Sequence, residues 1–104
     1  MTQSLALTAD ERDGVAQILS AHLPPDVDVC VFGSRAGDGT PKPWSDLDLA
    51  LRGPAALPLS LMAELAEAFD ESPLPFKVDL VDRTTVNAAF GAIIDATARP
   101  FPRR

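Results

Sequence analysis

The chain has 104 residues, of which 46% are hydrophobic and 23% charged, with a formal net charge of −6 and one cysteine. This length suits one small domain over residues 1–104, and no signal-peptide pattern or membrane-spanning apolar run is visible, so we expect a cytoplasmic protein without membrane contact. The negative charge disfavours direct binding to nucleic acid, because phosphate contacts need clustered Lys and Arg side chains.

The first half of the chain predicts one helix and two strands. Thr8 and Glu11 form a capping-box pattern at the start of a helix over residues 9–22, which ends at two prolines. Alternating valines predict a strand over 27–32, and alternating leucines predict a second strand over 46–52. A polar loop with several glycines joins these two strands.

The second half predicts two helices with a strand between them. An apolar stripe at four-residue spacing indicates a helix over 58–70, and a third strand follows over 76–81. Asp82 follows that strand and is expected to be a turn residue. A last helix, weakened by Gly91, is expected to begin at a capping threonine, Thr84 or Thr85. The C-terminal tail has too many prolines to extend any element.

The order helix, strand, strand, helix, strand, helix predicts an α+β fold. We expect a small mixed sheet of three or four strands with the helices packed on one face, because each helix has a single apolar stripe to bury. The opposite face of the sheet is expected to stay open, with the polar strand residues pointing toward it.

Two aspartates in the second predicted strand stand where apolar residues would stabilise a strand better. Asp46 and Asp48 share one face of this strand, while Leu47 and Leu49 face the core. Asp79 has the same setting in the third strand, so a third carboxylate joins the pair if the two strands are neighbours. We predict that Asp46, Asp48 and Asp79 are catalytic residues and metal ligands.

Neighbouring carboxylates repel each other, and a divalent cation between them reverses that balance. Hard oxygen ligands select Mg²⁺ or Mn²⁺, and Mg²⁺ usually completes its shell with substrate phosphates. The predicted cofactor is therefore Mg²⁺, with Mn²⁺ as the alternative, and the predicted substrate is a nucleoside triphosphate.

The end of the first predicted strand carries a candidate phosphate site. Gly33 and Ser34 open a short helical turn whose backbone N–H groups, with the serine hydroxyl, are expected to bind an anion. Arg35 is predicted to contact the β- or γ-phosphate in a bidentate manner, whereas Lys42 is interpreted as an ordinary solvated charge. Neither a Walker-type loop nor a dinucleotide-binding fingerprint is present.

The candidate phosphate site and the three aspartates together are a more specific signal than any one of them alone. Asp26 and Asp28 also form an Asp-x-Asp pair with no functional reason, which shows how easily that pattern arises. A Gly-Ser pair, a loop, an Asp-x-Asp between apolar residues and an aspartate on a later strand form a much rarer set.

The segments "FGSRA", "SDLDLAL" and "VDLVD" resemble the DNA polymerase β nucleotidyltransferase superfamily, and the small size and the "IIDATARPF" ending resemble its minimal nucleotidyltransferases. This resemblance implies that Gly33 and Ser34 bind the triphosphate, that Asp46 and Asp48 hold metal, and that Asp79 is the third carboxylate. The loop departs from the usual Gly-Ser-Arg-Ala-Arg-Gly pattern, since it reads "GSRAGDG" and lacks the second arginine. The departure implies weaker or differently arranged triphosphate binding.

Minimal nucleotidyltransferases of this kind are commonly antitoxins paired with a helical HEPN-type ribonuclease toxin. The resemblance thus implies an enzyme that transfers AMP from ATP to a tyrosine of a HEPN-type toxin partner, with which it forms a hetero-oligomer. Two alternatives are a non-catalytic steric antitoxin and a nucleotidyltransferase that modifies a small molecule such as an aminoglycoside.

Overall fold

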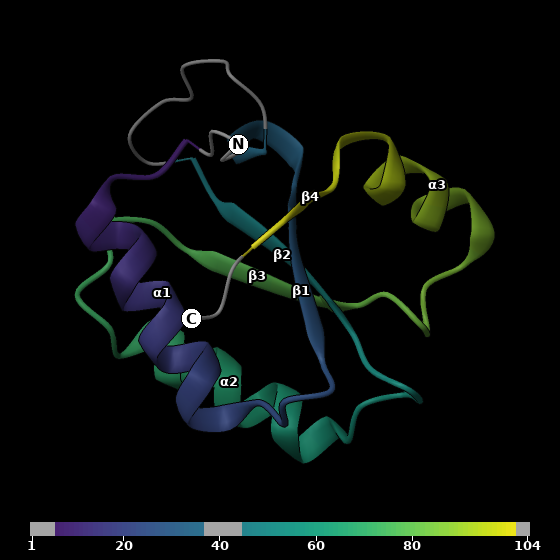
Figure 1. Cartoon of the computed structure of the whole chain (residues 1–104), viewed down its shortest axis with the longest axis horizontal. Coiled ribbons are helices and arrows are strands. Elements are labelled where there is room, and N and C mark those ends of the chain that lie inside the picture. The colour runs from purple at the N-terminus through teal and green to yellow at the C-terminus, as the bar shows by residue number, and fades with distance from the viewer. Residues whose placement is uncertain (1–5, 37–44, 102–104) are drawn as a thin grey trace.

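The structure is a computed structural model, and it describes residues 6–36 and 45–101 (Figure 1). In chain order its elements are α1 (Ala9–His22), β1 (Asp28–Phe32), the 3₁₀ turn η1 (Gly33–Arg35), β2 (Leu47–Arg52), α2 (Leu59–Asp70), β3 (Val78–Asp82), α3 (Ala88–Thr97) and β4 (Arg99–Pro100). The predicted order of helices and strands is confirmed. None of the helices within the described ranges has both the length and the apolar character needed to cross a bilayer.

The four strands form one mixed sheet in the order β3-β2-β1-β4. β1 runs antiparallel to β2 and to β4, and β2 runs parallel to β3. The prediction that the proline-rich tail adds no element is wrong. A short edge strand forms because Arg99 pairs with Val31, and Phe101 donates its N–H to the Val29 carbonyl and is buried. Prolines are tolerated at such a sheet edge.

One face of the sheet carries the main core. The inward side chains of β1 and β2 are apolar and pack against α1, which lies to the left of β1 in Figure 1, and α2, which lies at the bottom of that view. Burying this apolar surface is the main source of stability of the domain. The fully buried large side chains of this core are Val15, Leu19, Val27, Val31, Leu47, Leu49, Leu51 and Leu65.

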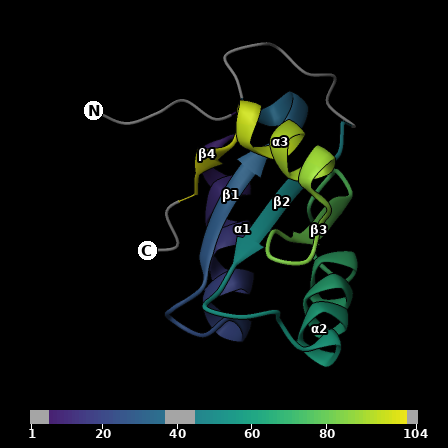
Figure 2. The same cartoon turned by 90° about the vertical axis from the view of Figure 1, so that its right-hand side faces the viewer.

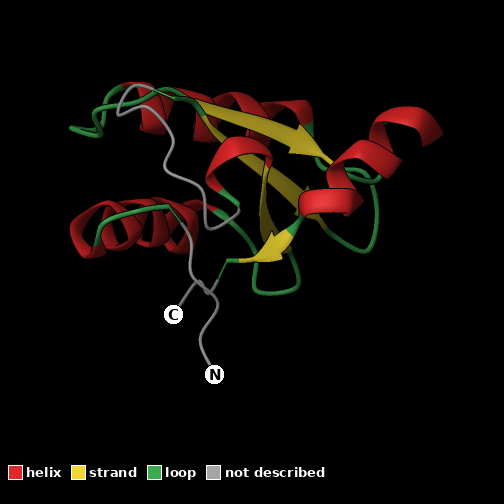
Figure 3. Ribbon diagram, turned by 90° about the horizontal axis from the view of Figure 1, so that it is seen from above, coloured by secondary structure: helices red, strands yellow, loops and turns green. Residues whose placement is uncertain are grey.

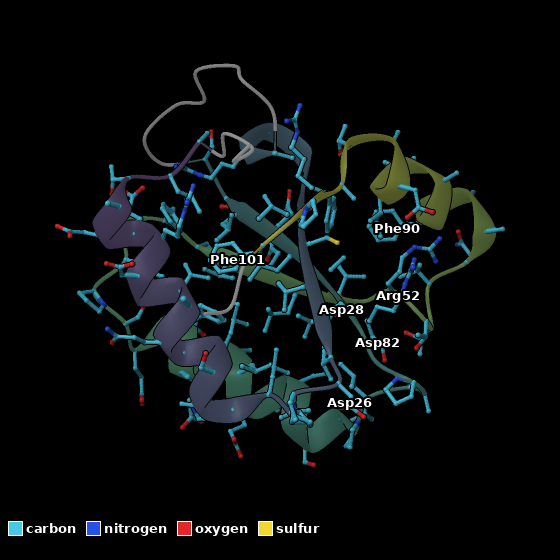
Figure 4. All side chains as sticks on the ribbon, viewed as in Figure 1. Asp26, Asp28, Arg52, Asp82, Phe90 and Phe101 are labelled. Atoms are coloured by element: carbon cyan, nitrogen blue, oxygen red, sulfur yellow. The ribbon has the colours of Figure 1, made fainter. Side chains whose placement is uncertain are left out.

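The opposite face of the sheet is only partly open. The last helix, α3, packs there through Ile94, which forms a second small core with Phe32 and Ala50. The views in Figures 2 and 3 place α3 across the strands from α1, and Figure 4 shows Phe90 and Phe101 on opposite sides of β1. The prediction that all helices pack on one face is therefore wrong for α3. Phe32 of β1 and Ala50 of β2 point away from the main core and provide the apolar surface that this helix covers.

The predicted cap of α3 is also wrong. The helix begins at Ala88, and the side chain of its N-cap Asn87 accepts a hydrogen bond from the Phe90 N–H at 2.8 Å. The two threonines proposed as caps bind the end of β3 instead. Thr84 donates its N–H and its hydroxyl to the Asp82 carboxylate, and Thr85 donates its hydroxyl to the Asp82 carbonyl. A turn that uses both threonines delays the start of the helix by two or three residues.

Asp82 anchors this turn from inside the molecule. Its side chain is buried and also accepts a hydrogen bond of 2.7 Å from the Leu57 N–H, which fixes the segment between β2 and α2. Burial by itself would raise the pKa of Asp82, but the hydrogen bonds from Leu57 and Thr84 outweigh it and hold the pKa below its ordinary value. The turn residue expected from the sequence is thus a buried structural anchor.

We expect Asp82→Asn to destabilise the fold by about 2 kcal/mol, because an amide in place of the carboxylate leaves the Leu57 N–H or the Thr84 donors without an acceptor. The contribution of a carboxyl with a lowered pKa is complete above the ordinary pKa and is lost as the pH falls through the folded-state value. Urea unfolding at pH 7 and at pH 3 checks both points. A mutational cost that is as large at pH 3 as at pH 7 would contradict the role of the ionised carboxylate.

Candidate functional site

Two of the three predicted carboxylates lie side by side on the parallel strands β2 and β3, and the third lies just before β2. Asp48 of β2 and Asp79 of β3 are direct register partners, so their side chains leave the same face of the sheet about 4.8 Å apart. Asp46 lies two residues before Asp48 on the same face, just ahead of β2, and its side chain is exposed. The sheet topology therefore brings carboxylates from two chain segments together, as the alternation of side chains along the two strands predicts for neighbouring strands.

The charge of Asp48 is disfavoured in this setting. Burial raises the pKa of its carboxyl, and the negative charges of Asp79 and Asp46 raise it further. All of these influences act in the same direction, so ionised Asp48 is at a free-energy cost in the folded protein. A bound cation would remove that cost, which is the physical argument for a ligand at this position.

The chemistry of these donors fits a hard divalent cation. Within residues 6–36 and 45–101, however, no three His, Cys, Asp or Glu side chains are already arranged closely enough to hold a metal ion. Mg²⁺ sites of nucleotide enzymes do not need such a cage, because one or two carboxylates and the substrate phosphates supply the ligands. The residues present therefore fit a cation that arrives with the triphosphate.

The glycine that ends β1 lies against Asp48. Gly33 has a φ of +78°, a conformation that side chains other than glycine rarely adopt. A Cβ atom added to it would lie 2.6 Å from the Oδ2 atom of Asp48. The backbone of the predicted phosphate turn and the central carboxylate are thus in direct contact, which only glycine permits.

The predicted helical turn at Gly33 forms as η1, and the Ala36 N–H closes it on the Gly33 carbonyl at 3.1 Å. Ser34 is exposed on this turn. The N–H of Gly33 does not point freely to solvent, however, because it donates to the hydroxyl of Thr97 at 3.1 Å. The turn therefore offers an anion the Ser34 hydroxyl rather than the Gly33 N–H.

Arg35 does not lie where the sequence prediction put it. Its side chain is 4% exposed, donates to the carbonyls of Ser45 and Ala6 at 2.9 and 2.7 Å, and stacks on the Phe76 ring at 4.3 Å. The predicted bidentate contact with a β- or γ-phosphate is at odds with this geometry. A guanidinium whose donors bind backbone carbonyls and whose face covers an aromatic ring acts as a structural clamp.

This clamp sets the start of β2. Arg35 precedes the loop after η1, and the carbonyl it binds belongs to Ser45, directly before Asp46. Its contact with Phe76 ties the same turn to the approach of β3, the strand that carries Asp79. Arg35 thereby positions the carboxylates indirectly. Lys42 and the loop segment that departs from the usual family pattern lie outside the described residues.

The residue of the site that sequence reasoning missed is Thr97. It lies 64 positions after Gly33, at the end of a helix, and no motif links the two. Only the packing of α3 on the carboxylate face reveals their contact.

A hollow of about 580 Å³ lies elsewhere, between the first turns of α1 and the loop from α2 to β3. It is lined by Thr8, Gly14, Ile18, Leu74 and neighbouring residues, on the side of the sheet that α1 and α2 cover. It includes none of the predicted site residues, so this hollow is separate from the candidate site.

Comparison with known proteins identifies the class to which this fold and this site belong. Residues 12–101 match the model of the nucleotidyltransferase domain, so the chain belongs to the nucleotidyltransferase family. Among curated proteins, the probable protein adenylyltransferase MntA of Haemophilus influenzae is 40% identical over 84 residues, which are 81% of this chain and 73% of that protein.

Solved structures share the fold. A chain of a toxin–antitoxin crystal structure with AMP-PNP gives a TM-score of 0.70 at 22% identity and covers 88% of this chain and 72% of that one. A chain from the complex of tri-AMPylated Shewanella oneidensis HEPN toxin with MNT antitoxin gives a TM-score of 0.65 at 19% identity, covering 88% and 68%. The predicted α+β nucleotidyltransferase fold is confirmed.

Proposed function

We propose that this chain is a metal-dependent protein adenylyltransferase that acts as an antitoxin. It transfers AMP from ATP to a tyrosine hydroxyl of a HEPN-type ribonuclease toxin, with which it forms a hetero-oligomer. The observation that carries the proposal is the pairing of Asp48 with Asp79 beside the Gly33 turn, in a chain of the nucleotidyltransferase family. The likeness to MntA and to toxin–antitoxin complexes supports the choice of acceptor.

The chemistry is an in-line displacement. The oxygen of the tyrosine hydroxyl attacks the α-phosphorus of ATP, the bond from that phosphorus to the bridging oxygen breaks, and pyrophosphate leaves. Positioning of the two reactants and neutralisation of the developing charge provide most of the acceleration. A divalent cation, Mg²⁺ or Mn²⁺, when bound, neutralises the triphosphate and makes the attacking hydroxyl easier to deprotonate.

Each residue of the site has a distinct role in this proposal. Asp46 and Asp48 would hold the cation, whose charge would relieve the burial and the repulsion that raise the pKa of Asp48. Asp79, from the neighbouring strand, accepts the proton of the acceptor hydroxyl and shares the cation. Gly33 lets the turn approach Asp48, and the exposed Ser34 hydroxyl binds a phosphate oxygen.

The consequence for the toxin follows from charge and size. An AMP group on a tyrosine near a ribonuclease active site adds a phosphate charge and a bulky nucleoside where the RNA backbone must bind. Covalent modification would therefore inactivate the toxin even after the two proteins separate. A purely steric antitoxin would lose its effect on dissociation.

The direct test is to incubate the purified chain with α-labelled ATP, Mg²⁺ and the product of the adjacent reading frame. We expect label on the partner and a mass increase of one or more AMP groups on a tyrosine, located by peptide mass spectrometry. EDTA and ATP labelled only in the γ-phosphate are the controls, and both should give no label. Stable complex formation without transfer would contradict the proposal and favour the steric antitoxin.

A further inference from the structure

We infer that Thr97 is a positioning residue that holds the Gly33 turn against Asp48; this inference rests on the proposed function. The Thr97 hydroxyl accepts the hydrogen bond of the Gly33 N–H at 3.1 Å, across 64 positions of sequence. It joins the end of α3 to the turn that is proposed to receive the triphosphate.

The turn has little freedom in which to move. Gly33 combines a φ of +78° with such close contact to Asp48 that an added Cβ would lie 2.6 Å from the carboxylate. A shift of the turn toward Asp48 is blocked by that contact, whereas a shift away from it would open the site. The Gly33 N–H is the donor through which a second residue can oppose this outward shift.

The backbone around Thr97 is held in place on both sides of this residue. One turn earlier in α3, Ile94 is 1% exposed and packs on Phe32 and Ala50. Two residues later, Arg99 pairs with Val31 in the sheet. Both anchors contact β1, the strand that leads directly into Gly33. The Thr97 hydroxyl is therefore held at a fixed place relative to β1 and to the turn that follows this strand. Figure 2 shows the end of α3 beside β1.

The hydrogen bond between Thr97 and Gly33 is expected to affect nucleotide binding and not only folding. With Thr97 in place, the turn that presents the Ser34 hydroxyl is held in its binding geometry before ATP arrives, which lowers the ordering cost of binding. Because the bond is exposed, water partly replaces it when it is lost. We therefore expect about a three- to tenfold loss of nucleotide affinity on its removal.

The test compares Thr97→Val and Thr97→Ala, which both lack the hydroxyl, with Thr97→Ser, which keeps it. The matched control is Asn87→Ala, which removes a hydrogen bond at the opposite end of the same helix. The probe is Mg²⁺ with α,β-methylene-ATP, whose α–β bond cannot be cleaved, and its Kd is measured by calorimetry. Exchange of the Gly33 amide proton, followed by NMR without nucleotide, provides a second readout.

The expected result is weaker binding and faster Gly33 exchange in the Val and Ala variants, with Ser and Asn87→Ala within about twofold of wild type. Tighter binding by Thr97→Val would overturn the inference, because it would mean that Thr97 competes with the phosphate. Equal losses in Thr97→Val and Asn87→Ala would also overturn it, because they would show an effect of α3 stability alone.

The two proposals fail in different ways. If the wild-type chain does not bind the magnesium–nucleotide probe, the proposed function fails, and with it the role of Thr97 in nucleotide affinity. Gly33 exchange still decides whether Thr97 holds the turn. If the wild type binds the probe and both hydroxyl-lacking variants bind it equally well, only the inference about Thr97 fails.

Discussion

Replacing Asp48 with asparagine should lower AMP transfer by about a hundred- to a thousandfold while leaving the fold at least as stable as the wild type. The loss follows from removing a charge that the cation and the triphosphate require in the transition state. The unchanged stability follows from the raised pKa of Asp48, because a carboxyl with a raised folded-state pKa destabilises the fold once it ionises.

Thermal unfolding with and without nucleotide measures both halves of this prediction. At about 100 times its Kd, magnesium–ATP should stabilise the wild type by roughly 2.7 kcal/mol, and Asp48→Asn should lose most of that gain. Without ligand, the melting temperature of the variant should equal or exceed that of the wild type.

Asp28→Asn is the matched control, because it makes the same chemical change in the other Asp-x-Asp pair of the chain. Asp28 begins β1 and pairs with Arg52, at the opposite end of that strand from Phe32 and the site (Figure 4). Transfer by this variant should remain near the wild-type rate. A similar loss in both variants would point to net charge rather than to the site, and full activity of Asp48→Asn would exclude the proposed metal ligand.

Gly33→Ala is expected to destabilise the fold by about 1–3 kcal/mol and to weaken nucleotide binding at least about tenfold. Two costs combine here. The φ of +78° is strained for alanine, and the new methyl group would lie 2.6 Å from the Asp48 carboxylate, so the turn or the carboxylate must move. Either movement separates the phosphate turn from the metal ligand. Urea unfolding and calorimetry with magnesium and α,β-methylene-ATP measure the two effects.

Gly14→Ala is the control for this prediction. Gly14 lies inside α1, and its added methyl group would meet Leu74 at an ordinary 3.6 Å, so this variant should be as stable as the wild type or more stable by about 0.5–1 kcal/mol. Combining Gly33→Ala with Asp48→Ala separates the two costs, because the smaller side chain removes the clash and leaves the strain. If the double variant recovers no stability, the contact with Asp48 does not contribute to the cost.

The sequence by itself predicted the elements and the faces of the strands. The apolar spacing of α1, α2 and the first three strands depends on neighbours along the chain, so their order and their approximate bounds were correct. The same periodicity placed Asp46 and Asp48 on one face, and Asp79 at the corresponding parity of β3, before any contact was known. The proposed carboxylate site needed only the further condition that β2 and β3 are neighbours, and the sheet meets it.

Arg35 and α3 show what the sequence left undecided. An arginine after a Gly-Ser pair has the same local sequence whether its side chain faces a phosphate or backbone carbonyls. In the structure, Arg35 donates to two backbone carbonyls. The apolar stripe of α3 shows that this helix must pack on the sheet, but it does not show on which face. Its side was decided by Phe32 and Ala50, which leave an apolar area on the face that also carries the carboxylates.

What the sequence determined about this protein is therefore the set of properties that follow from apolar periodicity within a few positions: the main helices and strands and the parity of the strand side chains. The local cap of α3 was the exception, because Thr84 and Thr85 bind Asp82 instead. What the tertiary structure alone decided is which distant groups meet, such as Thr97 with Gly33 and Asp82 with Leu57. The physical reason is that local periodicity follows from backbone geometry, whereas long-range contacts depend on how the whole sheet and its helices pack together to bury the core.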